Sequence, residues 1–173
     1  RLVPYAPMRD QPRIDTDIMY DNLMNKAKWG GLDKNEVWMD ENNLRMASTM
    51  RMQMRTLATS LIQEGKKDKA LEVLKKCMEV LPERNVPFYD PCPLNYSYYL
   101  AQTFYLADGK EEAVKLSNRL FDIIEGDVEY VVSVRKSEPG VMQSYLDDRL
   151  ELMQQLISDA HRFNANDAAK NYE

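Results

Sequence analysis

The sequence has almost none of the residues from which catalytic and metal sites are most often built. It contains one histidine, His161, and no residue spaced to partner it as a metal ligand or as the base of a nucleophile. It has no glycine-rich phosphate loop, no HExxH motif and no GxSxG motif. Asp147, Asp148 and Glu151 are interleaved with Arg149, which is typical of a solvated helix face rather than of a divalent-cation site. We therefore predict no catalytic residue, no metal and no cofactor.

Cysteine is also scarce, with two residues that form neither a disulfide framework nor the spacing of a metal site. Cys77 falls on the apolar side of a predicted helix and is expected to be a core residue. Cys92 lies between two prolines in a predicted loop. Whether the two cysteines form a disulfide bond is left open, because this depends on whether the compartment is oxidising.

The sequence lacks a long apolar run, an excess of basic residues and a signal peptide. No run approaches the roughly 20 apolar residues of a membrane-spanning helix. The net charge of −5 argues against a nucleic-acid-binding surface, because phosphate binding needs a basic face. Since the chain begins with Arg1 rather than with methionine, we expect it to be a piece of a longer protein.

What the sequence does contain is a helix–turn–helix pattern in residues 51–82. Ala58 and Ala70 are small, so two helices can cross closely at these positions, and Gly65 lies at the turn between the helices. Large apolar residues surround the crossing and a proline closes the unit: Met54, Leu57, Leu61, Leu74 and Pro82. This spacing resembles the 34-residue tetratricopeptide repeat (TPR). It predicts one helical hairpin.

The pattern occurs a second time, 43 residues further along the chain. The equivalents of Leu57, Ala58, Leu61 and Ala70 are Leu100, Ala101, Phe104 and Ala113. The surplus over the usual period, about nine residues, is taken up by a proline-rich segment at 83–93, and Asp108-Gly109 supplies the second turn. Two hairpins at matched spacing predict an all-α fold of TPR-like repeats.

The flanking segments complete the predicted architecture. Residues 1–14 contain three prolines and are predicted to be an extended arm or linker. The TPR-like domain is predicted to span 15–163, and 164–173 to be a frayed tail. Its helices are expected at 15–28, at 42–64 with Asn42 and Asn43 as the N-cap, at 66–80, and at 141–163 as a C-terminal capping helix.

Two local features allow more than one interpretation. Trp29 and Trp38 flank a connector at 32–41, and we expect them to pin it onto the core rather than to form an exposed aromatic platform. Gly126 is expected to interrupt the second hairpin. Residues 128–134 are rich in β-branched side chains, which favours a strand, but the helical surroundings favour a helix, and we predict a helix.

In an array of such hairpins the first helices line the concave face, and the side chains not used for packing point into it. Arg51 and Arg55 lie one turn apart and are placed to hold a carboxylate. Tyr98 and Tyr105 offer flat apolar area with a hydroxyl, which suits a peptide or a sugar. The alternative is that these tyrosines pack against the proline-rich loop or the last helix. The predicted binding residues are Arg51, Arg55, Thr59, Gln63, Tyr98, Gln102 and Tyr105.

Longer segments resemble one family of membrane proteins. They are RLVPY (1–5), IDTDIMYDNLMNKAKWGGLD (14–33), DENNLRM (40–46) and LIQEGKKDKALEVLKKCMEVLP (61–82). These segments are similar to the C-terminal region of large multi-span membrane proteins of Bacteroidetes, a family defined as a domain of unknown function and related to eukaryotic membrane O-mannosyltransferases with TPR repeats. The resemblance implies a periplasmic, extracytoplasmic tail, linked through 1–14 to the membrane part of a glycosyltransferase-like parent. The catalytic residues of such enzymes lie in the membrane part.

We therefore expect a non-catalytic protein-interaction module that docks an acceptor or partner, as a protein or a peptide, for a membrane glycosyltransferase. A glycan-binding module in polysaccharide handling is one alternative. A purely structural domain that packs on the parent's own transmembrane region is another. Peptide binding predicts dependence on Arg55 and on salt, whereas sugar binding predicts dependence on Tyr98 or Tyr105 and little effect of salt.

Overall fold

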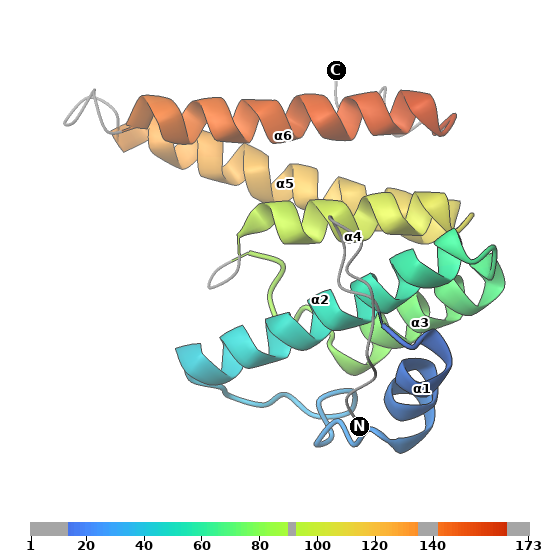
Figure 1. The fold of residues 1–173 in the computed structure, drawn as a ribbon. Coiled ribbons are helices and arrows are strands. Elements are labelled where there is room, and N and C mark those ends of the chain that lie inside the picture. The colour runs from blue at the N-terminus through green and yellow to red at the C-terminus, as the bar shows by residue number, and fades with distance from the viewer. Residues whose placement is uncertain (1–13, 90–92, 135–141, 166–173) are drawn as a thin grey trace.

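The structure, a computed structural model, describes residues 14–89, 93–134 and 142–165, and the regular elements within them are all helices (Figure 1). The prediction of an all-α fold is confirmed for these residues, which contain no β-strand. Within the same ranges, no helix has both the length and the apolar character needed to cross a membrane. The elements are α1 (Thr16–Asp21), the π-helix η1 (Asn22–Lys26), α2 (Glu41–Gln63), α3 (Lys67–Val80), α4 (Leu94–Leu106), α5 (Lys110–Val134) and α6 (Met142–Arg162).

The first helix pair consists of α2 and α3, which pack against each other in opposite directions (Figure 1). The turn between them has Gly65 in the left-handed conformation, with φ +76°. The amide of Lys66 donates to the carbonyl of Leu61 over 2.8 Å, and the amide of Gly65 donates to that of Ile62 over 2.9 Å. These bonds satisfy carbonyls that the end of a helix leaves without partners. The predicted role of Gly65 is confirmed.

The second pair consists of α4 and α5, and its turn uses a different residue for the same purpose. Asp108 takes the left-handed conformation, with φ +62°, which aspartate tolerates better than most side chains. Gly109 is needed for space, because a Cβ at this position would lie 2.5 Å from Cδ1 of Leu71 in α3. The second turn is therefore also a contact between the two helix pairs.

The core is built from the repeated small and large residues. The eight residues of the repeated pattern are all buried: Leu57, Ala58, Leu61, Ala70, Leu100, Ala101, Phe104 and Ala113. Met54 and Cys77 are buried with them, so the prediction that Cys77 is a core residue is confirmed. Burial raises the pKa of the Cys77 thiol to about 12 and keeps it protonated at neutral pH.

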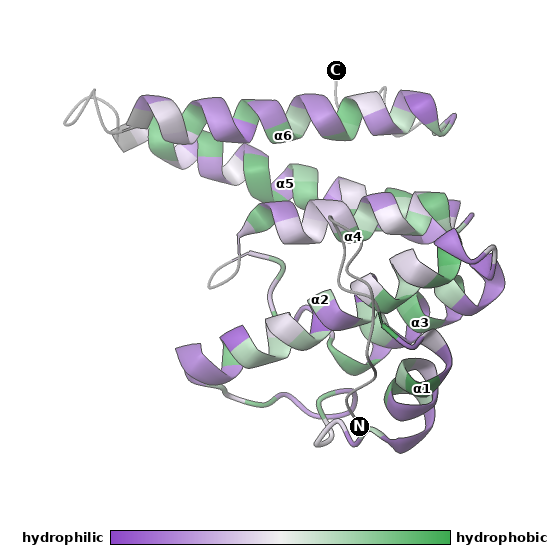
Figure 2. Ribbon diagram, viewed as in Figure 1, coloured by the Kyte–Doolittle hydropathy of each residue, from purple (hydrophilic) through white to green (hydrophobic). Residues whose placement is uncertain are grey.

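The helices α2, α4 and α6 run in the same direction, and α3 and α5 run back (Figure 1). The helix α4 contacts α2 and α6, and α6 also contacts α5. Hydrophilic and hydrophobic residues alternate along α6, as expected for an amphipathic helix (Figure 2). The packed region continues past α6 to Ala165, which is buried and whose amide donates to the carbonyl of Ala160 over 2.7 Å. The rest of the predicted tail lies outside the described residues.

Both helices at the N-terminal side begin at an aspartate. Asp15 accepts a hydrogen bond from the amide of Ile18 over 3.0 Å, as predicted for the start of α1. At the start of α2 the cap is Asp40, which accepts from the amide of Asn43 over 2.9 Å. The prediction that Asn42 and Asn43 form this cap is wrong, because the carboxylate of Asp40 already satisfies the amide at the third helical position.

The connector between η1 and α2 is held by an asparagine rather than by tryptophan. Trp29 packs on the core, but Trp38 is 87% exposed, so the prediction that both rings pin the connector is wrong for Trp38. Asn85, a buried residue of the proline-rich segment, donates to the carbonyls of Leu32 and Asn35, both over 2.7 Å. Its oxygen also accepts from the amide of Val37 over 2.9 Å. Such contacts between distant segments cannot be read from spacing.

The helix α5 continues through Gly126 to Val134. The prediction that Gly126 interrupts the hairpin is wrong, whereas the prediction of a helix for 128–134 is confirmed up to the last described residue. The reason is packing: Val131 is buried and Val128 is half-buried, and the contact between α5 and α6 outweighs the β-propensity of this segment.

We predict opposite effects for alanine at two glycines. Gly126 is exposed within a helix and has no atom within 4 Å of a new Cβ, so Gly126→Ala should raise the free energy of unfolding by about 0.5–1 kcal/mol. Gly65 has a positive φ, so Gly65→Ala should lower it by about 1 kcal/mol. Urea unfolding followed by circular dichroism measures both. A loss of stability in Gly126→Ala would show that the helix is broken there.

Candidate functional site

The seven predicted binding residues do not share one surface. Arg51, Tyr98 and Tyr105 are buried, and only four of the seven remain accessible to a partner: Arg55, Thr59, Gln63 and Gln102. Both groups lie on α2 and α4. The buried residues make contacts within the fold, and the others remain accessible on the same two helices.

Arg51 holds the proline-rich segment instead of a ligand. Its side chain is 6% exposed, and its guanidinium donates to the carbonyls of Leu81 (2.9 Å), Val86 (2.5 Å) and Pro87 (3.1 Å). The guanidinium also lies 4.8 Å from the centre of the Phe88 ring. The predicted clamp formed by Arg51 and Arg55 on a carboxylate is therefore not present in the structure, because Nη1 and Nη2 of Arg51 already donate to these carbonyls.

Tyr98 and Gln102 join α4 to α6 through one carboxylate. The hydroxyl of Tyr98 donates to Asp159 over 2.8 Å, and the amide of Gln102 donates to the same oxygen over 3.2 Å. Burial and the hydrogen bond to Asp159 raise the pKa of Tyr98. The neighbouring Tyr105 stacks on Phe163, with ring centres 4.7 Å apart. The alternative prediction, in which these tyrosines pack against the last helix, describes both of them.

Of the two arginines among the predicted binding residues, Arg55 is the one that the fold leaves accessible. It is half-buried, and its guanidinium lies 5.5 Å from the centre of the Tyr99 ring, in the range of a cation–π contact. Burial lowers the pKa of Arg55, since the charged form has lost part of its hydration. Among the described residues, no carboxylate lies within ion-pair distance of this guanidinium. Arg55 is thus a partly desolvated cation that lacks an acidic partner there.

Accessible residues of three helices combine into one surface around Arg55. Tyr99 is 43% exposed and lies between the cation of α2 and the polar side chains of α6. We call this surface the α2–α4–α6 face and define it by five residues: Arg55, Thr59, Tyr99, Gln102 and Gln155. The predicted binding residues did not include Tyr99, and they did not include Gln155 because α6 was predicted only as a capping helix.

The surface has little depth where α2 meets α4. The space enclosed by Met52, Arg55, Tyr96 and their neighbours measures about 10 Å³, which is too small for a side chain of a partner. A wider cavity of about 480 Å³ opens between the first turn of α4 and α6, beside Tyr99 and Gln155. A ligand of the face would therefore lie across the helices rather than within a groove between them.

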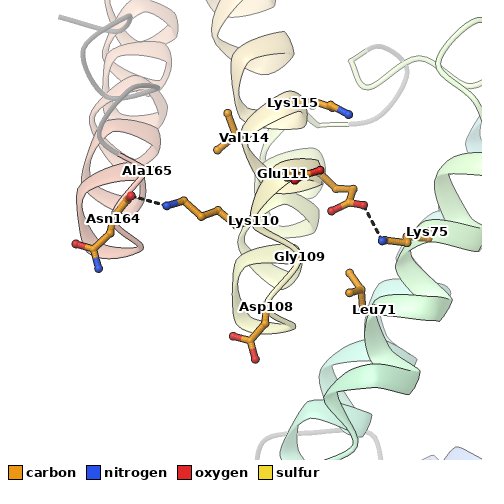
Figure 3. A pocket seen from close by; sticks show the side chains of 11 residues that line it. Leu71, Lys75, Asp108, Gly109, Lys110, Glu111, Val114, Lys115, Asn164 and Ala165 are labelled. Carbon is orange, nitrogen blue, oxygen red and sulfur yellow. Dashed lines mark hydrogen bonds and ion pairs between the residues drawn. The ribbon is translucent and has the colours of Figure 1, made fainter.

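Another cavity, about 790 Å³, lies on a different part of the molecule, at the start of α5 (Figure 3). Four of its charged groups have partners. Lys75 forms an ion pair with Glu112 at 2.8 Å, and Lys110 donates to the carbonyl of Asn164 over 2.6 Å. Asp108 is paired with Lys67 at 2.9 Å. The charged side chains of the lining are three of each sign, Lys75, Lys110 and Lys115 against Asp108, Glu111 and Glu112, so the cavity favours neither an anion nor a cation.

The described residues contain no group of three or more His, Cys, Asp or Glu side chains that could hold a metal ion. His161 is exposed on α6, and Asp147, Asp148 and Glu151 are exposed on the same helix. Cys92 lies outside the described residues. The α2–α4–α6 face presents a guanidinium, a hydroxyl, two amides and an aromatic ring to solvent.

Comparisons with models of protein families, with curated proteins and with solved structures find no match for this chain.

We predict that two arginines one turn apart differ strongly in their effect on stability. Arg51→Met leaves three buried carbonyls without their donor, and we expect it to lower the free energy of unfolding by about 3 kcal/mol. Arg55→Met removes a half-exposed cation without an acidic partner among the described residues and should cost less than about 1 kcal/mol. Urea unfolding of both variants provides the comparison. Equal losses would contradict the separation of roles.

Proposed function

We propose that this chain is a non-catalytic protein-interaction module that binds an extended peptide segment of a partner across the α2–α4–α6 face. The observation that carries the proposal is Arg55, a half-buried guanidinium that lies over Tyr99 and lacks an acidic partner among the described residues. A partner's carboxylate would supply the missing charge. A charge-assisted, bidentate bond of this kind is stronger than a neutral one.

The surroundings of Arg55 suit such a contact. Tyr99 and Tyr96 are partly exposed on α4, and rigid tyrosine rings bury large area at low entropic cost. Arginine and tyrosine are also the residues most often found at the energetic centre of interfaces. The amides of Gln102 and Gln155 add hydrogen-bonding groups along the path of an extended chain.

We further propose that the two helix pairs form a TPR-like array, with α6 as its cap. The support is the repeat of four buried residues at an interval of 43, the same direction of α2, α4 and α6, and the packing of α6 on α4 and α5. In such arrays the first helices present the ligand-binding surface, which agrees with the position of the α2–α4–α6 face.

The cellular setting is proposed from sequence resemblance alone. On that basis the chain is the periplasmic tail of a polytopic glycosyltransferase-like membrane protein, and the peptide belongs to an acceptor or to an accessory partner. A tail that packs on the parent's own transmembrane region is the structural alternative. The face would then be covered within the parent, and free peptides would compete poorly for it.

Selection of peptides from a random display library tests the proposal. We expect the selected peptides to share an aspartate or glutamate, because Arg55 requires an anion. Arg55→Gln should weaken their binding about tenfold, and added salt should weaken binding to the unmodified chain. Isothermal titration of synthetic peptides measures both effects.

Arg45→Gln is the matched control. Arg45 also lies on α2, but it is exposed and already paired with Glu41 at 2.6 Å, so its replacement should leave peptide affinity unchanged. Selected peptides without a common acidic residue, or equal losses in the two variants, would contradict the proposal.

A further inference from the structure

The cavity between α4 and α6 has a lining unlike that of the rest of the α2–α4–α6 face. It has a volume of about 480 Å³, within the range of small-ligand sites. Asn95 and Tyr99 line it from α4, and Asp148, Glu151 and Gln155 line it from α6. The helix α4 thus supplies an aromatic ring, and both helices supply planar amide or carboxylate groups.

One wall of this cavity is fixed by Arg149. This residue is 9% exposed, and its guanidinium donates to Asp127 over 3.1 Å, to the Tyr89 hydroxyl over 3.0 Å and to the Tyr145 hydroxyl over 2.9 Å. Burial alone would lower the pKa of Arg149, but the hydrogen bonds to Tyr145 and Asp127 raise it. Because one charged group joins the proline-rich segment, α5 and α6, the wall is held in place before any ligand arrives.

The charges of the lining exclude most classes of ligand. Asp148 and Glu151 would repel an anion, and because the charge of Arg149 in the wall is balanced by Asp127, these two carboxylates leave the lining negative. A purely apolar ligand would bury carboxylate and amide groups without hydrogen bonds, which is costly. The charges therefore leave two classes, a cation and a neutral ligand with many hydrogen-bonding groups, and the arrangement of the hydrogen-bonding groups favours the second.

The hydrogen-bonding groups match adjacent hydroxyls. The amide of Gln155 donates to one oxygen of Glu151 over 3.2 Å, which leaves the carbonyl of Gln155 and the second carboxylate oxygen as acceptors. Asn95 and Asp148 make no hydrogen bond through their side chains to the described part of the chain. Each of these planar groups presents two polar atoms side by side, and the exposed ring of Tyr99 offers a flat surface for the C–H groups of a sugar ring.

We propose that this cavity binds a neutral sugar ring, with Tyr99 as the stacking surface and Asn95, Glu151 and Gln155 as hydroxyl-binding groups. The site differs from that of the glycan alternative drawn from the sequence, since Tyr98 and Tyr105 are buried and cannot stack on a ligand. It also does not require Arg55 and therefore does not depend on the peptide proposal.

Nuclear magnetic resonance of the ¹⁵N-labelled chain tests this site. The probes are the methyl glycosides of mannose, glucose, galactose and N-acetylglucosamine, added one at a time at millimolar concentration. We expect at least one of them to shift the side-chain amide signals of Asn95 and Gln155 in a saturable way. Asn95→Ala and Gln155→Ala should each weaken that binding about fivefold.

Two further variants separate the possible results. Gln154→Ala, an exposed neighbour outside the cavity, should leave sugar binding unchanged, and so should Arg55→Gln, even where it abolishes peptide binding. The proposal is overturned if no glycoside gives a saturable shift, or if the cavity variants bind as well as Gln154→Ala. It is also overturned if the signals respond only to inorganic phosphate, to free arginine or to an acidic peptide.

Discussion

The position of the second helix pair on the first depends on the buried guanidinium of Arg51. The proline-rich segment between the pairs contains Pro87, Pro91 and Pro93, which have no amide to donate. Arg51 reaches from α2 and donates to the carbonyls of Val86 and Pro87 in this segment and of Leu81 just before it. The hydroxyl of Ser97 in α4 donates to another carbonyl of the segment, that of Phe88, over 2.7 Å. The segment is thereby held from both sides, and α2 and α4 are set against each other.

This arrangement gives two neighbouring arginines different functions. Once Arg51 has fixed α4 beside α2, the next turn of α2 brings Arg55 over the ring of Tyr99. Asp159 then joins α4 to α6 through Tyr98 and Gln102, so α6 becomes a third wall of the same surface rather than only a cap. The proposed recognition surface is thus a consequence of polar contacts that are themselves buried and unavailable to ligands.

Local patterns predicted much of the fold, and contacts between distant segments explain where they failed. Ala58 and Ala101 mark close helix crossings, and Gly65 a left-handed turn, because each requirement concerns a few neighbouring residues. The inward direction of Arg51 depends on carbonyls some thirty residues away, which no helical spacing reveals. The connector predicted to be held by Trp38 is held by Asn85, some fifty residues from it in sequence, and α5 continues through Gly126 where it packs on α6.

The central claim is that the α2–α4–α6 face binds a partner. The most direct test is photocrosslinking of the full protein in the cells that produce it. A photoreactive amino acid replaces Thr59 on this face or, as the comparison, Glu79, which is exposed on α3. The account predicts a discrete crosslinked product at position 59 that disappears with Arg55→Gln, and none at position 79. A product at position 79 alone, or products at both positions that persist without Arg55, would contradict it.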